Sequence, residues 1–462
     1  MARNTRKKKG GVYISEGTYG CVFGKPPLKC IEDAKRLEED VISKLMNKKE
    51  AETEYKESEK WRAIDPTQEF SLYAFKICKL DKENIKPSNN TNRCKAFRKP
   101  VHGQPKRDTL LFYKYGGSDL SKLKVQAKNY KPLFKAFAPL IDGLAIAHEH
   151  NLVHLDIKPP NILAELKDDK IHLRFIDFGL SLDTKKLEAI PDLYTNAYPY
   201  WPFELKAFDE NYGDIIAKKF IAIELDRFNK DKYNTSTRDS LPLTRIDADS
   251  AYSILKRYNF RDYNKSLPKV DVYSIGVVLT NLLSLYFSYY ITDEGDYYKP
   301  YYYDANYDIY SSIGNLVSKT DLTKEQIEFH TTLYDNLLLP LVKFIRKCTE
   351  FDPRERYDTK EAAEEYKKLL PLFDTYLDAS KVREGLADQR ILNESPDIPY
   401  IKTPGSSKST NSKPYVAPNV RVPNQVNELD RIFENLQGLE EEQSLEVSPK
   451  TSSRKSKSSR KK

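Results

Sequence analysis

Hydrophobic and polar residues alternate near the start of the chain and take up a helical period further on. Residues 11–23 alternate around Gly17 and Gly20, which predicts two strands joined by a glycine turn. Residues 48–64 are charged and contain no Gly or Pro, which predicts a helix. Strand-like runs follow at 70–80 and 109–115. The residues between them, 81–107, are polar and broken by prolines, which predicts a loop.

The second half of the chain is mainly helical in pattern. Residues 130–150 have a helical period, and the apolar stretch 270–291 contains Asp271, Ser274 and Asn281, which favours a buried helix over a membrane span. Between about 206 and 268, charged and aromatic residues mix without a sustained period, which indicates a loop-rich insertion. We find no repeat of fixed period, so a solenoid or propeller is not expected.

Both ends of the chain are basic. The net charge of +8 is concentrated in the runs 3–9 and 454–462, which we interpret as solvated tails. Such runs also bind nucleic acid, acidic proteins or anionic membranes, or serve as a nuclear address, and these alternatives stay open. Pro, Ser, Asn and Lys dominate residues 377–462, which predicts a mostly disordered tail with a short helix at 425–445.

Composition narrows the class of protein. With 462 residues, the chain is long enough for one large domain or two to three average ones. Five cysteines form no C-x-x-C pair, and the N-terminus lacks the apolar run of a secretory signal. We therefore expect a soluble protein in a reducing compartment.

The strongest chemical signal consists of two short runs, HLDIKPPNIL at 154–163 and FIDFG at 175–179. They resemble the catalytic loop, H-R-D-L-x-x-x-N, and the D-F-G motif of the protein kinase family, in the same order and at a typical separation. Asp156 or Asn161 alone would more often cap a turn. Two ordered motifs in one chain outweigh that interpretation.

The resemblance implies a role for each polar residue of these runs. Asp156 would accept the proton of the substrate hydroxyl, and Lys158 would lie near the transferred phosphoryl group. Asn161 and Asp177 would hold Mg²⁺ on the phosphates of ATP. A lysine two residues after the aspartate is the pattern of serine/threonine kinases.

Upstream, the run ISEGTYGCV at 14–22 is similar to the glycine-rich loop of the family, G-x-G-x-x-G-x-V, with Ser15 in place of the first glycine. Gly17 and Gly20 would let the backbone approach the phosphates, and Val22 would pack on the adenine. Alone, a G-x-x-G run is more often just a turn. Its distance upstream of the catalytic loop gives it weight here.

Two lysines compete for the ATP phosphates. Lys76, in the run YAFK, imitates the V-A-I-K motif of the family, but no helix with a glutamate partner follows it. Lys44, in the run VISK, is followed by the helical segment 48–64 and then by two strands. The order of elements selects Lys44. Its partner is Glu54 or Glu57, of which we choose Glu54.

Three later runs resemble structural motifs of the same family: YPYWPFE at 198–204, DVYSIG at 271–276 and DPRER at 352–356. By that resemblance, Arg356 pairs with Glu204, and Asp271 braces the backbone of the catalytic loop. Small-molecule phosphotransferases usually lack this set, so a protein substrate is favoured.

The resemblance implies an α+β, two-lobed protein kinase fold over residues 10–370. An N-lobe of antiparallel strands and one helix (about 10–116) and a mainly helical C-lobe (about 117–370) would enclose ATP, with main-chain groups of the hinge at 113–117 binding adenine. The basic tail at 1–9 and the tail at 377–462 flank this domain. Leu155 stands where most regulated kinases have the arginine that binds an activation-loop phosphate, so that switch is not expected.

Within the family, the residues of several motifs look most like those of kinases of large cytoplasmic DNA viruses. That resemblance implies that the protein is located in the host cytoplasm or the virion, with the nucleus as an alternative. Rival hypotheses are a catalytically silent pseudokinase scaffold and a small-molecule kinase. The physiological substrate is not named by the sequence. Ser452, Ser456 and Ser458 are candidate autophosphorylation sites, although simple low complexity is the favoured interpretation.

Overall fold

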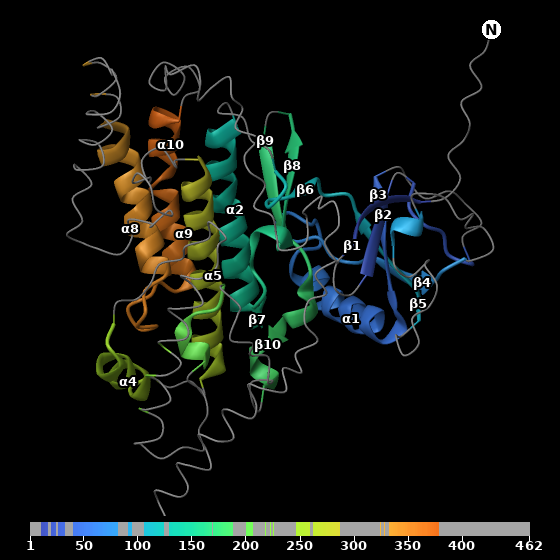
Figure 1. The fold of residues 1–462 in the computed structure, drawn as a ribbon, viewed down its shortest axis with the longest axis horizontal. Helices are drawn as coiled ribbons and strands as arrows, with labels where there is room; N and C mark the ends of the chain where they lie inside the picture. The colour runs from blue at the N-terminus through green and yellow to red at the C-terminus, as the bar shows by residue number, and fades with distance from the viewer. Residues whose placement is uncertain are drawn as a thin grey trace, which may run out of the picture. The chain divides into compact units, whose positions relative to one another are not determined.

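An antiparallel sheet of five strands forms the first part of the computed structural model (Figure 1). Its strand order is β1-β2-β3-β5-β4, so that β3 lies at the centre and pairs with both β2 and β5. The strands have the bounds Val12–Glu16 (β1), Gly20–Gly24 (β2), Val41–Asn47 (β3), Lys76–Lys79 (β4) and Arg107–Lys114 (β5).

The structure describes residues that all lie in one compact unit, 1–401. The described ranges are 11–16, 20–24, 26–32, 40–81, 91–94, 106–123, 129–168, 170–187, 200–206, 246–258, 262–286 and 332–377, with the single residues 218, 222, 225, 324 and 328. The predicted tail at 1–9 lies outside these ranges, as does the predicted tail at 377–462 except for Leu377, and with it the helix expected at 425–445.

One helix, α1 (Lys48–Ile64), packs against the sheet, as the charged run predicts. It begins where the Asn47 side chain accepts the Glu50 N–H and ends before Pro66, which disfavours helix in the residue before it. Its buried side chains recur every three or four residues, so one stripe faces the protein. That stripe consists of Ala51, Glu54, Ser58 and Trp61.

The second part of the structure is helical, and Figure 1 shows its long helices running side by side. A large apolar core joins α2 to α5, α8, α9 and α10, and the Tyr366 hydroxyl donates to the Phe134 carbonyl at 2.8 Å inside it. The helices are α2 (Tyr130–Glu149), α4 (Ala248–Lys256), α5 (Tyr263–Tyr286), α8 (Leu339–Cys348), α9 (Thr359–Lys367) and α10 (Leu370–Tyr376). None of the described helices combines the length and the hydrophobicity that crossing a membrane requires.

Short strands between the two parts carry the catalytic-loop region. β6 (Ser118–Asp119), β8 (Ile162–Lys167) and β9 (Lys170–Phe175) form a three-stranded sheet, and β7 (Leu152–Val153) pairs with β10 (Leu182–Asp183). The architecture is therefore α+β, with a sheet lobe that carries one helix and a helical lobe, as expected.

Two boundaries differ from the expectations. The Phe75 N–H donates to the Phe112 carbonyl of β5 at 2.9 Å, but residues 70–72 do not join the five-stranded sheet: the Phe175 N–H donates to the Phe70 carbonyl at 2.9 Å, and the Leu72 N–H donates to the Phe175 carbonyl at 2.9 Å. The segment therefore bonds to β9 in the other lobe, and β4 begins only at Lys76. Helix α4 lies inside the range 206–268, for which loops were expected. It begins there because the Asp247 side chain accepts the Ser250 N–H and so caps the first turn.

The bonding state of four cysteines also differs from what we expect in a reducing compartment, where they would be free thiols. Cys21 is bonded to Cys94, and Cys30 is bonded to Cys78. The partners are 73 and 48 residues apart in sequence, so no short spacing signals either bond. Both lie in the apolar core of the sheet lobe.

Candidate active site

Lys44 and Glu54 form an ion pair between β3 and α1. Lys44 Nζ lies 2.8 and 2.7 Å from the two carboxylate oxygens of Glu54, and both side chains are largely buried. Burial by itself lowers the pKa of the Lys44 ammonium, but the carboxylates of Glu54 and Asp177 outweigh it and raise that pKa. Lys44 is therefore a charged donor at neutral pH.

The two rival residues lie elsewhere. Glu57 contacts Lys60, one turn along the same helix, at 2.5 Å. Lys76 begins β4, where its ammonium lies 5.6 Å from the centre of the Phe112 ring. The structure thus brings Lys44, and not Lys76, next to the glutamate of α1.

Asp156 is the centre of a small hydrogen-bonded group in the catalytic loop. Lys158 Nζ lies 2.9 and 3.0 Å from its carboxylate oxygens. Asn161 Nδ2 donates to the backbone carbonyl of Asp156 at 2.9 Å and to its carboxylate at 2.6 Å. Because both amide hydrogens are used in this way, Asn161 Oδ1 is the oxygen that can turn to a cation.

Asp271, on α5, holds the backbone ahead of Asp156. Its carboxylate accepts the His154 N–H at 2.7 Å and the Leu155 N–H at 2.8 Å, and His148 Nε2 lies 3.0 Å from the same group. Leu155 has a left-handed backbone conformation, with φ of 59°. The predicted bracing contact is confirmed, and it fixes a strained backbone next to Asp156.

Asp177 also has a left-handed backbone, with φ of 65°, and precedes a buried phenylalanine. The ring of Phe178 stacks on Trp61 of α1, with 4.3 Å between ring centroids. Trp61 Nε1 donates to Ser181 Oγ at 3.0 Å, just past the motif. These two contacts join the end of α1 to the segment that carries Asp177. The Asp177 carboxylate lies close enough to Lys44 to raise the pKa of its ammonium.

The described residues of the glycine-rich run lie in the antiparallel strands β1 and β2, in which Ser15 pairs with Val22. Val22 in turn pairs with Lys44 on β3. A side chain at Gly20 would lie 2.5 Å from the Leu45 carbonyl oxygen, so packing against β3 requires a glycine there irrespective of any phosphate. Gly17 lies outside the described residues.

The segment after β5 also depends on glycine. Gly117 has a φ of 89°, and a Cβ there would lie 2.1 Å from the Ala164 carbonyl oxygen. A pocket of about 420 Å³ lies beside this turn, lined in part by Asp40, Tyr115 and Leu166. The expected hinge thus packs its backbone directly onto β8.

The predicted pair of Arg356 and Glu204 is confirmed. Arg356 Nη1 and Nη2 lie 2.5 and 3.1 Å from the two carboxylate oxygens, and both side chains are buried. Burial alone lowers the pKa of Arg356, but Glu204 outweighs it and raises that pKa. Ser274, of the predicted α5 motif, donates to the Tyr200 carbonyl at 2.8 Å and so holds the same segment.

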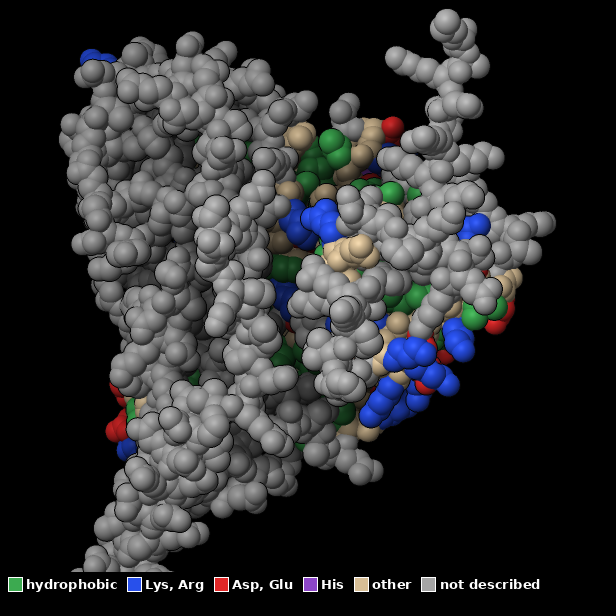
Figure 2. Space-filling model, turned by 45° about the vertical axis from the view of Figure 1, so that its right-hand side comes forward, with side chains coloured by type: hydrophobic (Ala, Val, Ile, Leu, Met, Phe, Trp, Pro, Cys, Tyr) green, Lys and Arg blue, Asp and Glu red, His purple; other side chains and the backbone are tan. Residues whose placement is uncertain are grey.

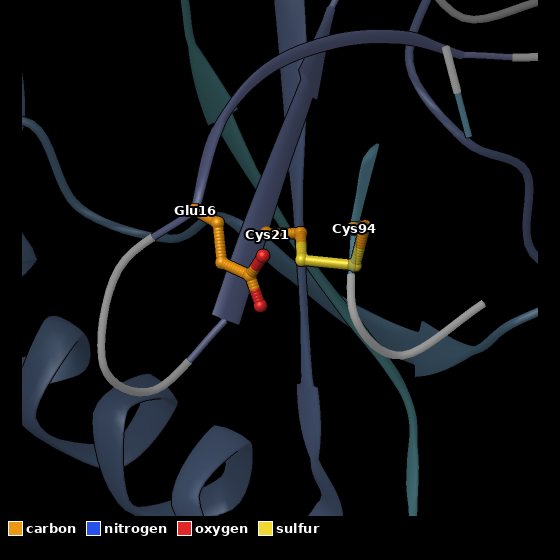
Figure 3. Close-up of side chains that lie close together, drawn as sticks. All are labelled: Glu16, Cys21 and Cys94. Carbon is orange, nitrogen blue, oxygen red and sulfur yellow. A yellow bond between two sulfur atoms is a disulfide. The ribbon is translucent and has the colours of Figure 1, made fainter. Parts of the chain in front are cut away.

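Figure 3 shows the disulfide nearest the glycine-rich run, with the Glu16 side chain reaching from the end of β1 toward Cys21 and Cys94. The Glu16 carboxylate lies 3.1 Å from Arg107 Nη1, which also lies 3.8 Å from the Cys21 sulfur. Three potential metal ligands gather here, but two are joined in a disulfide and the third is paired with a cation. This cluster therefore serves to tie β2 to the segment at 91–94.

Basic side chains of the described residues gather in the right-hand part of the view in Figure 2, beside acidic ones. The terminal runs 3–9 and 454–462 lie outside the described residues. Nucleic-acid contact by these runs stays a prediction.

The sequence motifs did not point to two residues that contact the site. Trp61 lies on the buried stripe of α1 next to the D-F-G phenylalanine, and Tyr113 on β5 donates a hydrogen bond to Glu54. The helical spacing from Glu54 to Trp61 could have indicated that both share one face. The bond from Tyr113 joins residues 59 positions apart and follows only from the pairing of β3 with β5.

Comparison with known proteins agrees with this geometry. Residues 14–201 match the family described as protein kinase domain. Together with the sheet lobe, its single helix and the helical lobe, the match defines the two-lobed α+β protein kinase fold.

Curated relatives match over shorter segments. The chain is 32% identical over 68 residues to serine/threonine-protein kinase 17A of Oryctolagus cuniculus, over 15% of this chain and 17% of that protein. It is 34% identical over 74 residues to calcium-dependent protein kinase 13 of Arabidopsis thaliana (16% and 13%) and 31% identical over 104 residues to calcium-dependent protein kinase 4 of Plasmodium berghei (22% and 20%). The matches thus span no more than a fifth of these relatives.

Proposed function

We propose that this protein is an ATP-dependent serine/threonine protein kinase. The observation that carries the proposal is the Asp156 carboxylate, held between Lys158 and Asn161, in a fold that also pairs Lys44 with Glu54. A turn cap needs neither partner. Two separate groups, one for a hydroxyl and one for phosphates, are what phosphoryl transfer requires.

Asp156 is the residue that accepts the proton of the attacking hydroxyl. Its side chain is 11% exposed, and Lys158 and Asn161 fix the direction of its carboxylate. Lys158, 27% exposed, offers a positive charge beside the same carboxylate and so next to the phosphoryl group in transfer. Holding both groups in place supplies orientation, which is most of what this reaction needs from a protein.

Lys44 is the residue that contacts the phosphates of ATP. Its ammonium is held by Glu54 and keeps its charge. Gly17, Gly20 and Ser15 form the loop over the phosphates, Val22 contacts adenine, and main-chain groups at 113–117 bind the adenine edge.

Mg²⁺ fits the donors at the end of the catalytic loop. Asn161 offers an amide oxygen and Asp177 a carboxylate, and oxygen ligands of this kind suit Mg²⁺. The bound ion supplies charge compensation for the phosphates. The left-handed backbone at Asp177 sets the direction of its side chain.

The substrate class follows from the later motifs. Lys158 supports a serine or threonine acceptor, and the pair of Arg356 and Glu204 supports a protein substrate, since small-molecule phosphotransferases usually lack that set. We keep the viral origin, the host cytoplasm, virion or nucleus as location, and phosphorylation of the tail serines as further predictions. They rest on sequence patterns alone.

The test is transfer of labelled phosphate from ATP to a generic basic protein in the presence of Mg²⁺. We expect Asp156→Asn and Asp177→Ala to lose transfer by orders of magnitude, while both variants keep the wild-type unfolding curve. A scaffold without catalysis would label nothing in any variant, and a small-molecule kinase would label a small acceptor but not the protein. Equal labelling by the wild type and both variants would remove the assignment.

A further inference from the structure

A tyrosine hydroxyl bonds to the ion pair at the centre of the sheet lobe. Tyr113, the last residue but one of β5, donates its hydroxyl hydrogen to Glu54 Oε1. The same oxygen accepts a hydrogen bond from Lys44 Nζ at 2.8 Å. Glu54 therefore has two donors, one from β3 and one from β5, and both strands pack against α1.

The ring of Tyr113 is held by apolar packing. It lies in a buried cluster with Ala51 of α1 and Leu111 of β5, and only 9% of the residue is exposed. An apolar body with one polar tip is a rigid support for a partner at that tip. Because this packing holds the ring in place, the hydroxyl constrains where the carboxylate of Glu54 lies.

The Tyr113 hydroxyl stays protonated, and so remains a donor, at neutral pH. Burial first, and then the Glu54 carboxylate, raise the pKa of Tyr113 well above its ordinary value. A hydrogen bond from a neutral donor to a carboxylate contributes more than one between neutral groups.

We propose that Tyr113 is a positioning residue for phosphoryl transfer, in which its hydroxyl fixes Glu54 and, through Glu54, sets the position of the Lys44 ammonium. This inference rests on the proposed function. In this inference, the hydrogen bond from Tyr113 to Glu54 does more than contribute to packing. Through it, strand β5, which leads to the hinge, sets the position of Lys44, the lysine that contacts the phosphates. Glu54 on its own can pair with Lys44 in more than one geometry, and the second donor selects one of them.

The test replaces Tyr113 with Phe, which keeps the ring and removes only the hydroxyl. We expect kcat/KM for ATP to fall about tenfold or more, the range for a lost bond to a charged group, with the KM for the protein substrate unchanged. Tyr73→Phe is the matched control: Tyr73 is also buried, and its hydroxyl donates to the carbonyls of Asp65 and Pro66, away from Lys44. That variant should stay within about twofold of wild type.

A double-mutant cycle separates positioning from packing. If Tyr113 acts through Glu54, Tyr113→Phe changes nothing further once Glu54→Ala, which removes the acceptor, is present. An equal loss in both backgrounds, or a Tyr113→Phe variant no worse than Tyr73→Phe, would overturn the inference. If Tyr113→Phe does not fold, Tyr113→Met removes the same hydroxyl and has the same two outcomes.

Calorimetric titration with MgATP keeps this test separate from the proposed function. If Asp156→Asn labels protein as well as wild type does, the proposed function fails, but ATP affinity still reports on Lys44. An affinity lowered by Tyr113→Phe only when Glu54 is intact supports the positioning role. An unchanged affinity overturns it.

Discussion

Arg356 and Glu204, which are 152 residues apart in the chain, meet in an ion pair whose guanidinium is fully buried and whose carboxylate is 4% exposed. The guanidinium also donates to the Glu350 and Lys269 carbonyls, so three segments are tied to one side chain. A buried charge without its partner is strongly unfavourable, whereas the intact pair contributes far less net stability.

Arg356→Met should therefore lower the free energy of unfolding by about 3–5 kcal/mol, because it leaves the Glu204 carboxylate buried and unpaired. Urea denaturation followed by circular dichroism measures the change. The exposed pair of Lys135 and Asp374 is the control, since Lys135→Ala should cost less than about 1 kcal/mol. Equal costs at both sites would contradict the burial argument.

Asp271→Ala should impair both stability and transfer. The substitution leaves the His154 and Leu155 N–H groups buried without an acceptor, at about 1–3 kcal/mol each. Because Leu155 holds a left-handed backbone next to Asp156, loss of the acceptor should also lower kcat. Parallel unfolding and kinetic measurements check this, and a stability loss with kcat unchanged would mean that Asp271 does not position the catalytic loop.

Lys44→Met and Lys76→Met should differ by orders of magnitude in activity. The first removes the ammonium that Glu54 and Asp177 act on, and the second removes a lysine on β4 that lies over the Phe112 ring. Steady-state kinetics with both variants decides the matter. A larger loss in Lys76→Met would overturn the assignment of the phosphate-binding lysine while leaving Asp156 untouched.

Sequence patterns predicted the elements best where local chemistry decides them. The helix expected at 48–64 matches α1 at both bounds, because an asparagine cap and a following proline mark its ends. The strand expected at 70–80 was too long, because its first residues bond to β9, which is distant in sequence. Local pattern cannot distinguish these two pairings.

The same distinction applies to the site. Asp156, Asn161 and Asp177 stand out because the roles that we propose for them need fixed side-chain types at short spacing. The order of elements selected Lys44 over Lys76. Tyr113 and the four bonded cysteines could not be predicted in this way, since their contacts depend on strand pairing across tens of residues.

The two disulfides lead to a chemical prediction. Alkylation in denaturant without reductant should label one cysteine, Cys348, and labelling after reduction should reach all five. Closed loops of this length typically contribute about 2–4 kcal/mol, so reduction should lower the unfolding midpoint. Mass spectrometry counts the labels. Five labels without reductant would mean that the sulfurs are thiols in the isolated protein, as the sequence led us to expect.

Leu155, by the resemblance of its motif, stands where regulated kinases have the arginine that binds an activation-loop phosphate. Its side chain is 3% exposed and lies in an apolar cluster with Trp201, whose indole N–H donates to the Leu155 carbonyl at 2.7 Å. An apolar side chain offers no charge to a phosphate, so packing rather than phosphorylation holds this part of the catalytic loop.

Protein produced in bacteria and treated with phosphatase should therefore be active without further modification. A variant with Tyr194→Phe, Thr195→Ala and Tyr198→Phe, which removes the hydroxyls of residues 188–199, should keep kcat within about twofold of wild type. Trp201→Phe, by contrast, should lower kcat, because the Leu155 carbonyl then loses its donor beside Asp156. Phosphorylation stoichiometry from intact mass, measured on the same samples as kcat, makes the comparison direct. Activity that appears only after phosphate is added within 188–199 would show that this loop depends on a phosphate after all.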